Sequence, residues 1–162
     1  MKLQANVFDV WVYRQGDRSS PSAADTEYLL LHTSQAKADR YFNGGRFWQI
    51  PSDLMADGET VTGAIDRLLD GFGLAPVEIW AAEYVYTIYN RRFDAMQMIA
   101  VYAARVEQCA VTLRAEEHAE YRWCGYDEAQ RLVNYRGLKE GLASVREYVT
   151  EREPPLRELR LD

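Results

Sequence analysis

The chain has 162 residues, 48% of them hydrophobic and 12% aromatic, with a formal net charge of −6. These values indicate one folded domain with a substantial core, and they argue against a disordered chain and against a nucleic-acid duplex as partner. No apolar run is long enough to span a bilayer, and the two cysteines, Cys109 and Cys124, lack metal-site spacing, so we expect a cytoplasmic protein without a membrane partner.

The first third of the chain has the composition of strands joined by turns. Residues 5–14 and 26–33 are rich in Val, Leu, Tyr and Trp and predict two strands, and the Ser-Ser-Pro-Ser run within 16–25 predicts a surface loop between them. A turn signal at 43–45 leads into a short aromatic strand at 47–48, which Pro51 closes. Arg46 at the entry of this strand has two interpretations, an anion contact or an ordinary solvated charge.

A helix is predicted from Glu59 to Gly71. Apolar residues recur at the spacing of a core-facing stripe, and Gly71 and Gly73 then end the helix. The members of the stripe are Val61, Ala64, Ile65, Leu68 and Leu69. The spacing predicts that Glu59, Asp66 and Asp70 share the opposite face, where they are either solvated or part of a displaced metal site.

Two long β-prone segments, 77–90 and 95–106, are joined by four residues and predict a hairpin. Arg91 and Arg92 at its tip are candidates for a phosphate clamp, because a guanidinium fork matches phosphate oxygens. The alternative is that they are the ordinary charged tip of an exposed hairpin.

Residues 113–123 place Glu116, Glu117 and His118 ahead of a strand at 121–124. A carboxylate beside other carboxylates can have a raised pKa and act as a base. His118 has no identifiable nucleophile at a defined spacing, so a surface or buried structural histidine is the simpler interpretation.

Helices are predicted at 127–133 and 138–149, followed by a charged, loosely held tail at 151–162. Leucines at 156, 159 and 161 would also suit docking on a second subunit, as in a homodimer. The order of elements predicts a single α+β domain over residues 1–150 with a mixed central sheet.

The loop and helix at 47–74 resemble the Nudix box, G-x5-E-x7-R-E-U-x-E-E-x-G-U with U aliphatic. With one residue deleted before Gly73, the matches are Trp48, Pro51, Gly58, Glu59, Ala64, Arg67, Leu69, Gly73 and Leu74. Ser52 and Asp53 replace the paired glycines that precede the loop, and Leu68 replaces the glutamate after the arginine. Gly71 and Phe72 stand where the motif has two further glutamates, so the box is degenerate at its magnesium-binding positions.

The resemblance covers about residues 5–150 and implies the Nudix α/β/α sandwich. It also implies hydrolysis of a diphosphate linkage in a nucleoside or pterin di- or triphosphate, with Mg²⁺ or Mn²⁺ as cofactor. The run Glu117-His118-x-x-Tyr121-x-Trp123 is similar to runs in dATP, dihydroneopterin-triphosphate and diadenosine-polyphosphate Nudix enzymes, where a loop acid binds metal or activates water. By that resemblance Glu117 is the first candidate for the catalytic acid and Glu116 the second.

Two functions remain open at this stage. In an active hydrolase, Glu59 and Asp70 would supply an altered metal site with Glu117, while Arg46, Arg91 and Arg92 would contact phosphates and Trp48 or Tyr89 would stack on a base. In the alternative, the helix cannot hold a divalent cation because Leu68 and Phe72 offer no oxygen ligand. The domain would then bind a small phosphorylated, nucleotide-like ligand or a protein partner without hydrolysis.

Overall fold

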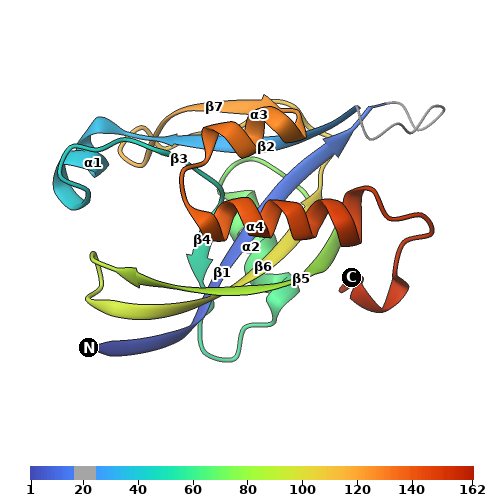
Figure 1. Ribbon diagram of the computed structural model, residues 1–162, viewed down its shortest axis with the longest axis horizontal. Coiled ribbons are helices and arrows are strands. Elements are labelled where there is room, and N and C mark those ends of the chain that lie inside the picture. Colours follow the sequence, from blue (N-terminus) through green and yellow to red (C-terminus); the bar gives the residue numbers. More distant parts are fainter. Residues whose placement is uncertain (17–24) are drawn as a thin grey trace.

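The computed structural model describes residues 1–16 and 25–162, so most of the loop predicted at 16–25 lies outside the described residues. A seven-stranded mixed sheet has the order β3-β2-β1-β6-β5, with β4 paired to β1 and β7 paired to β2. Helix α2 lies on one face of the sheet, and α3 and α4 cover the other (Figure 1). The strands are β1 (Lys2–Gln15), β2 (Thr26–Thr33), β3 (Trp48–Gln49), β4 (Ser52–Leu54), β5 (Glu78–Asn90), β6 (Ala95–Arg105) and β7 (His118–Cys124). The helices are α1 (Gln35–Tyr41), α2 (Val61–Asp70), α3 (Tyr126–Leu132) and α4 (Arg136–Val145), which continues as a π-helical turn at Arg146–Thr150.

The core has two halves because alternate residues of a strand point to opposite faces of the sheet. In β1, Phe8 and Val10 pack on the α2 side, whereas Trp11 and Tyr13 pack on the side of α3 and α4. On α2 the predicted stripe provides the matching surface, and its residue Leu69 is completely buried.

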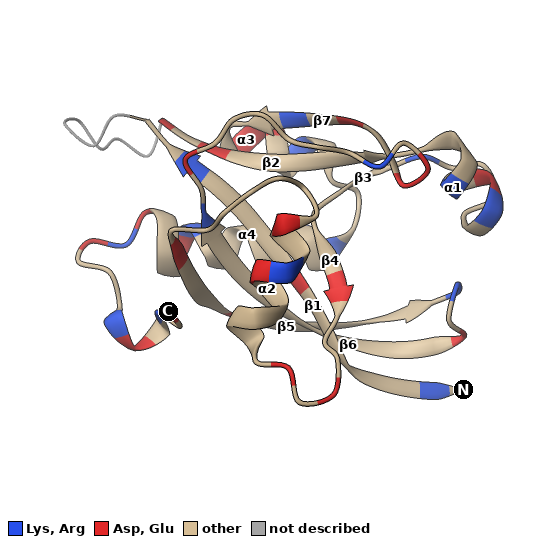
Figure 2. Cartoon of the chain, turned by 180° about the vertical axis from the view of Figure 1, so that it is seen from behind, with Lys and Arg blue, Asp and Glu red and all other residues tan. Residues whose placement is uncertain are grey.

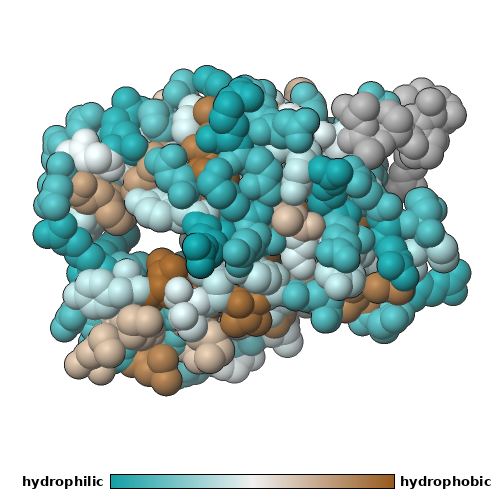
Figure 3. Space-filling view, viewed as in Figure 1, coloured by the Kyte–Doolittle hydropathy of each residue, from teal (hydrophilic) through white to brown (hydrophobic). Residues whose placement is uncertain are grey.

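The sheet divides in a way that positions the site. Strand β1 pairs with β2 only at Tyr13–Gln15 in the register, and nearer its start it pairs instead with β4 at Val7–Asp9. The half with β2, β3 and β7 therefore separates from the half with β1, β6 and β5, and residues 49–53 cross between the halves. The space-filling view shows an opening through the molecule in this region (Figure 3).

Most predicted elements are confirmed, but the start of one helix is wrong and another helix is absent from the prediction. The predicted start of the helix at Glu59 is wrong because Thr60 is the N-cap and its side chain accepts a hydrogen bond from the Gly63 N–H. Glu59 consequently lies in the preceding loop and does not share a helix face with Asp66 and Asp70. Helix α1 was missed, although Ser34 caps it by accepting a hydrogen bond from the Lys37 N–H.

The end of the chain is not a loosely held tail. The Leu161 N–H donates to the Ile79 carbonyl at 2.9 Å, and the Ile79 N–H donates to Asp162 Oδ1 at 2.9 Å. Leu159 packs against the core on the α4 side. The last residues thus cover the outer edge of β5. Among the described helices, none combines the length and apolar character needed to cross a bilayer.

Candidate functional site

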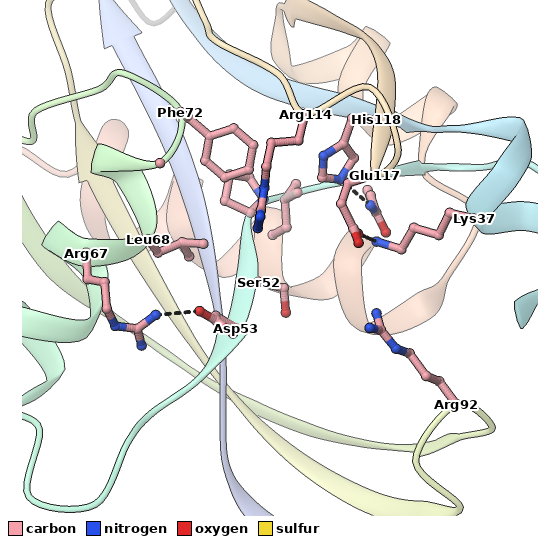
Figure 4. Close-up of a pocket in the computed structure, with 14 residues that line it drawn as sticks. Lys37, Ser52, Asp53, Arg67, Leu68, Phe72, Arg92, Arg114, Glu117 and His118 are labelled. Atoms are coloured by element: carbon pink, nitrogen blue, oxygen red, sulfur yellow. Dashed lines mark hydrogen bonds and ion pairs between the residues drawn. The ribbon is translucent and has the colours of Figure 1, made fainter. Parts of the chain in front are cut away.

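A pocket of about 390 Å³ opens on the α2 side of the gap between the two halves of the sheet. Its volume is in the range of small-molecule sites. Five parts of the chain line it: α1, the crossing segment 49–53, the end of α2, the tip of the β5–β6 hairpin and the loop before β7. Figure 4 shows side chains from all five directed towards one space.

Arg67, which lines the pocket, holds the loop before α2 in shape. Its guanidinium donates to Glu59 Oε1 at 2.7 Å and Oε2 at 3.0 Å, to Asp53 Oδ2 at 2.7 Å and to the Leu54 carbonyl at 3.1 Å. The hydrogen bond from Arg67 lowers the pKa of Glu59 to about 2, with help from the Ala56 N–H. Gly58 turns the loop with φ of +77°, a conformation that glycine adopts without strain. Arg67 and Glu59 are therefore committed to the architecture of the loop.

The pocket side of α2 carries no metal ligand. Leu68, Gly71 and Phe72 line the pocket, while Asp66 and Asp70 are exposed and lie outside its lining. Magnesium requires several oxygen ligands in near-octahedral geometry. Within residues 1–16 and 25–162, no group of three His, Cys, Asp or Glu side chains is placed to hold a metal ion. These residues do not fit the magnesium site of the Nudix box.

The floor of the pocket connects to a buried carboxylate. Ser52, which lines the pocket, donates from Oγ to Asp9 Oδ1 at 2.6 Å, and the Tyr86 hydroxyl donates to Asp9 Oδ2. Burial raises the pKa of Asp9 to about 6 despite these two hydrogen bonds. Asp9 is only 3% exposed, so it supports the floor without contacting the pocket space directly.

The pocket is electropositive although the chain is acidic. Four cationic side chains line it, those of Lys37, Arg67, Arg92 and Arg114, against the two carboxylates Asp53 and Glu117. This is an excess of two positive charges in a chain of net charge −6. Figure 2 shows basic residues on α1, at the hairpin tip and in the loop before β7 on the same side of the molecule. Such a pocket attracts an anionic ligand.

Comparison with solved structures identifies the fold. The chain aligns with the C. elegans Ap4A hydrolase (TM-score 0.66, 17% identity, 94% of this chain and 100% of that one) and with the E. coli dihydroneopterin triphosphate pyrophosphohydrolase (0.62, 14%, 94% and 100%). It also aligns with the NUDIX domain of Shewanella oneidensis NrtR complexed with ADP ribose (0.66, 16%, 93% and 91%). The chain has the Nudix fold. No family model and no curated protein matches the sequence.

In this Nudix fold the predicted acid Glu117 does line the pocket, but it is paired. Its Oε2 lies 2.7 Å from Lys37 Nζ. Burial raises the pKa of Glu117, but the hydrogen bond and charge of Lys37, with the charge of Arg92, outweigh burial and leave the pKa below its ordinary value. The side chain of Glu116 is exposed and outside the pocket lining, although its backbone carbonyl accepts a hydrogen bond from Ser34 Oγ.

His118 is part of the pocket wall and is neutral at physiological pH. Burial lowers its pKa to about 4, and the charges of Lys37 and Arg114 act in the same direction. Its Nε2 lies 2.6 Å from Gln49 Nε2. The histidine therefore adds no charge to the pocket.

Arg46 and Trp48 are predicted ligand contacts, but neither side chain lines the pocket. Both contact other parts of the protein instead. Arg46 Nε donates to the Thr33 carbonyl at 2.8 Å, and its Nη2 lies 3.0 Å from His32 Nδ1. Trp48 stacks on the His32 ring with centroids 4.5 Å apart. Trp48 thereby joins β3 to β2, and Arg46 joins the segment before β3 to β2.

The hairpin tip separates its two adjacent arginines. Both side chains are exposed, but Arg92 lines the pocket and Arg91 does not. Tyr89, another predicted contact, donates its hydroxyl to Asp94 Oδ1 at 2.9 Å and also lies outside the lining. The fold therefore brings Arg92, but not Arg91 or Tyr89, to the candidate site.

Sequence reasoning missed Lys37 and Arg114 as site residues. Lys37 lies on α1, which the Ser34 cap followed by the helix formers Gln35, Ala36 and Lys37 could have indicated. Arg114 lies in an irregular loop of the chain, and no spacing pattern in the sequence connects it to the pocket.

Proposed function

We propose that this Nudix-fold protein binds a small phosphorylated, nucleotide-like ligand in the pocket and does not hydrolyse it by magnesium-dependent Nudix chemistry. One observation carries the proposal. The α2 side of the pocket presents Leu68, Gly71 and Phe72, while Lys37, Arg92 and Arg114 supply positive charge from the other walls. The pocket suits the anion that a Nudix site handles, but its carboxylates cannot assemble a divalent-cation site.

The ligand class follows from charge and size. A pocket of this volume holds a small organic molecule, and its excess positive charge favours one that carries phosphate. Structures with this fold include an Ap4A hydrolase, a dihydroneopterin triphosphate pyrophosphohydrolase and a domain complexed with ADP ribose. The polyphosphate or diphosphate shared by these three named compounds is the element that we assign to the pocket.

A hydrolase is the second candidate, because Glu117 lies in the pocket on the loop where the resemblance places an acid. In that case Glu117 would take part in cleavage of a diphosphate linkage with Mg²⁺ or Mn²⁺. Its ion pair with Lys37 opposes this role, because a carboxylate with a lowered pKa is a weaker base.

The two candidates are separated by measuring binding and turnover together. Thermal unfolding is followed with ADP ribose, diadenosine tetraphosphate and dihydroneopterin triphosphate, each with EDTA, Mg²⁺ or Mn²⁺, and release of phosphate and pyrophosphate is assayed in the same samples. We expect at least one compound to raise the Tm in EDTA, since a ligand that binds the folded state stabilises it, without any turnover. Adenosine and neopterin, which lack phosphate, serve as controls and are expected to have no effect.

Cleavage that depends on Mg²⁺ or Mn²⁺ would establish the hydrolase instead. Absence of stabilisation by every phosphorylated compound, with and without metal, would contradict both candidates. A cytoplasmic location and a homodimer stay predictions, and the second is measured by sedimentation of the purified chain.

A further inference from the structure

Three cations reach the pocket from separate parts of the fold. Lys37 comes from α1, Arg92 from the tip of the β5–β6 hairpin and Arg114 from the loop before β7. In Figure 4 the Arg92 guanidinium points towards the Lys37–Glu117 pair, and Arg114 extends into the pocket beside Phe72. Their charged groups therefore surround one space from three sides.

The two arginines have donors free for a ligand. The Arg92 guanidinium lies over the Tyr41 ring at 4.4 Å, a contact that positions the group but does not use its N–H donors. Within the described part of the chain, the Arg114 side chain forms no hydrogen bond or ion pair. A guanidinium presents up to five N–H donors in a fixed fork, which suits phosphate oxygens.

Lys37 differs from the two arginines because it already forms an ion pair with Glu117. The two charged atoms are 2.7 Å apart, and only 13% of the Lys37 side chain is exposed. Glu117 is also the one lining carboxylate that the Arg67 network does not hold, since Asp53 is bonded to Arg67. Glu117 thus places one negative charge where the three cations converge.

We propose that Lys37, Arg92 and Arg114 bind the phosphate groups of the ligand directly, without a divalent cation, and that Glu117 is an internal counter-ion that competes with the phosphate for Lys37. This inference rests on the proposed function, since it assigns the contacts within the same pocket. It gives Glu117 the opposite role to a catalytic acid. Removing its charge should improve binding, whereas removing a catalytic or metal-binding carboxylate should impair it.

The test is titration of inorganic pyrophosphate into the protein by calorimetry, in EDTA and low salt. Glu117→Gln is close to the shape of the native side chain and removes one repulsive charge, so we expect pyrophosphate to bind about fivefold to tenfold more tightly. Arg92→Gln and Arg114→Gln each remove a charge-assisted contact and should weaken binding about tenfold.

Two matched controls account for overall charge. Arg91→Gln changes the neighbouring arginine on the same hairpin tip, and Asp66→Asn removes an exposed carboxylate of α2. Neither residue lines the pocket, so both variants should bind pyrophosphate as the native chain does, within about twofold. Thermal unfolding of every variant without ligand identifies any variant that fails to fold. Lys37→Gln should also weaken pyrophosphate binding and provides an independent measurement.

Unchanged or weaker binding by folded Glu117→Gln would overturn the counter-ion role. Binding of pyrophosphate only in the presence of Mg²⁺ would overturn direct contact by the cations, while a phosphorylated-ligand pocket would survive. If neither pyrophosphate nor any nucleotide-like compound bound under either condition, the proposed function itself would fail.

Discussion

Arg67 and Leu68 are adjacent in α2, yet they belong to two regions of the box with opposite properties. The Arg67 region matches the Nudix pattern and forms the network with Glu59 and Asp53 that shapes the loop. The Leu68 region departs from the pattern and presents an apolar surface with Phe72 to the pocket. The loop and helix of this chain therefore form without the metal ligands of the motif, because hydrogen bonds, glycine turns and core packing build them.

The largest expected effect is on the core side of α2. Leu69 is completely buried, so Leu69→Ala removes packed methyl groups and leaves a cavity. We expect a loss of about 3 kcal/mol in the free energy of unfolding, measured by urea denaturation. Leu68→Ala, on the half-buried pocket side of the same turn, is the matched variant and should cost less than half as much. Equal losses of unfolding free energy for the two variants would show that the pocket side of α2 contributes as much to stability as the core side.

The next effect concerns the glycine that ends the box. Gly73 has φ of +70°, and a Cβ there would lie 3.1 Å from Thr112 Oγ1. Gly73→Ala should therefore cost about 2 kcal/mol, because it adds a close contact to a left-handed backbone conformation. Gly58→Ala is the comparison, since Gly58 has φ of +77° but nothing within 4 Å of its Cβ position. Gly58→Ala should lower the free energy of unfolding, measured by chemical denaturation, by less than Gly73→Ala does. A larger loss for Gly58→Ala would refute this account of the turn.

A smaller, pH-dependent effect is expected at Arg67. The pKa of Glu59 is about 2 in the folded chain, below its ordinary value of 4.5. Its charge therefore contributes stability that is fully present above about pH 4.5 and is lost as the pH falls towards 2. Arg67→Gln should lower the Tm at pH 7, and the difference from the native chain should shrink as the pH falls through this window.

Arg136→Gln is the control for that experiment, because the Arg136 side chain is 88% exposed and its ion pair with Glu140 is 4.0 Å long. It should change the Tm little at either pH. A Tm difference for Arg67→Gln that stays constant from pH 7 to pH 2.5 would mean that the charge of Glu59 is not what Arg67 stabilises.

The smallest expected shift is a response to metal on the pocket side. Leu68→Glu combined with Phe72→Glu places two carboxylates at the half-buried surface of the pocket, one near the end of α2 and the other in the turn that follows it. We expect a small new rise in Tm on addition of Mn²⁺, since oxygen ligands are now available. Leu68→Gln with Phe72→Gln should show no such rise. A double glutamate variant without a Mn²⁺ response would indicate that the residue deleted before Gly73 has changed the path of the turn.

Most of the elements and the character of α2 follow from the sequence alone. Its apolar stripe, the glycines at 58 and 73 and the hairpin at 77–106 are local patterns, and local patterns follow from backbone geometry and side-chain periodicity. The box positions of Arg67 and Glu59 also indicated the loop, because their spacing within one loop and helix is a short-range property. Periodicity nevertheless predicts a helix from Glu59, because it does not mark the N-cap that Thr60 provides.

Which charges meet depends on the tertiary structure. Lys37, Arg92 and Arg114 come from a helix, a hairpin tip and a loop, and they converge because the sheet divides where β1 leaves β2. The same division brings Arg92 to the pocket and leaves Arg91 outside its lining, although both share one turn. A one-residue step along a hairpin tip changes the direction of a side chain. Pairing between distant strands fixes that direction in space, and such pairing leaves no short-range pattern in the sequence.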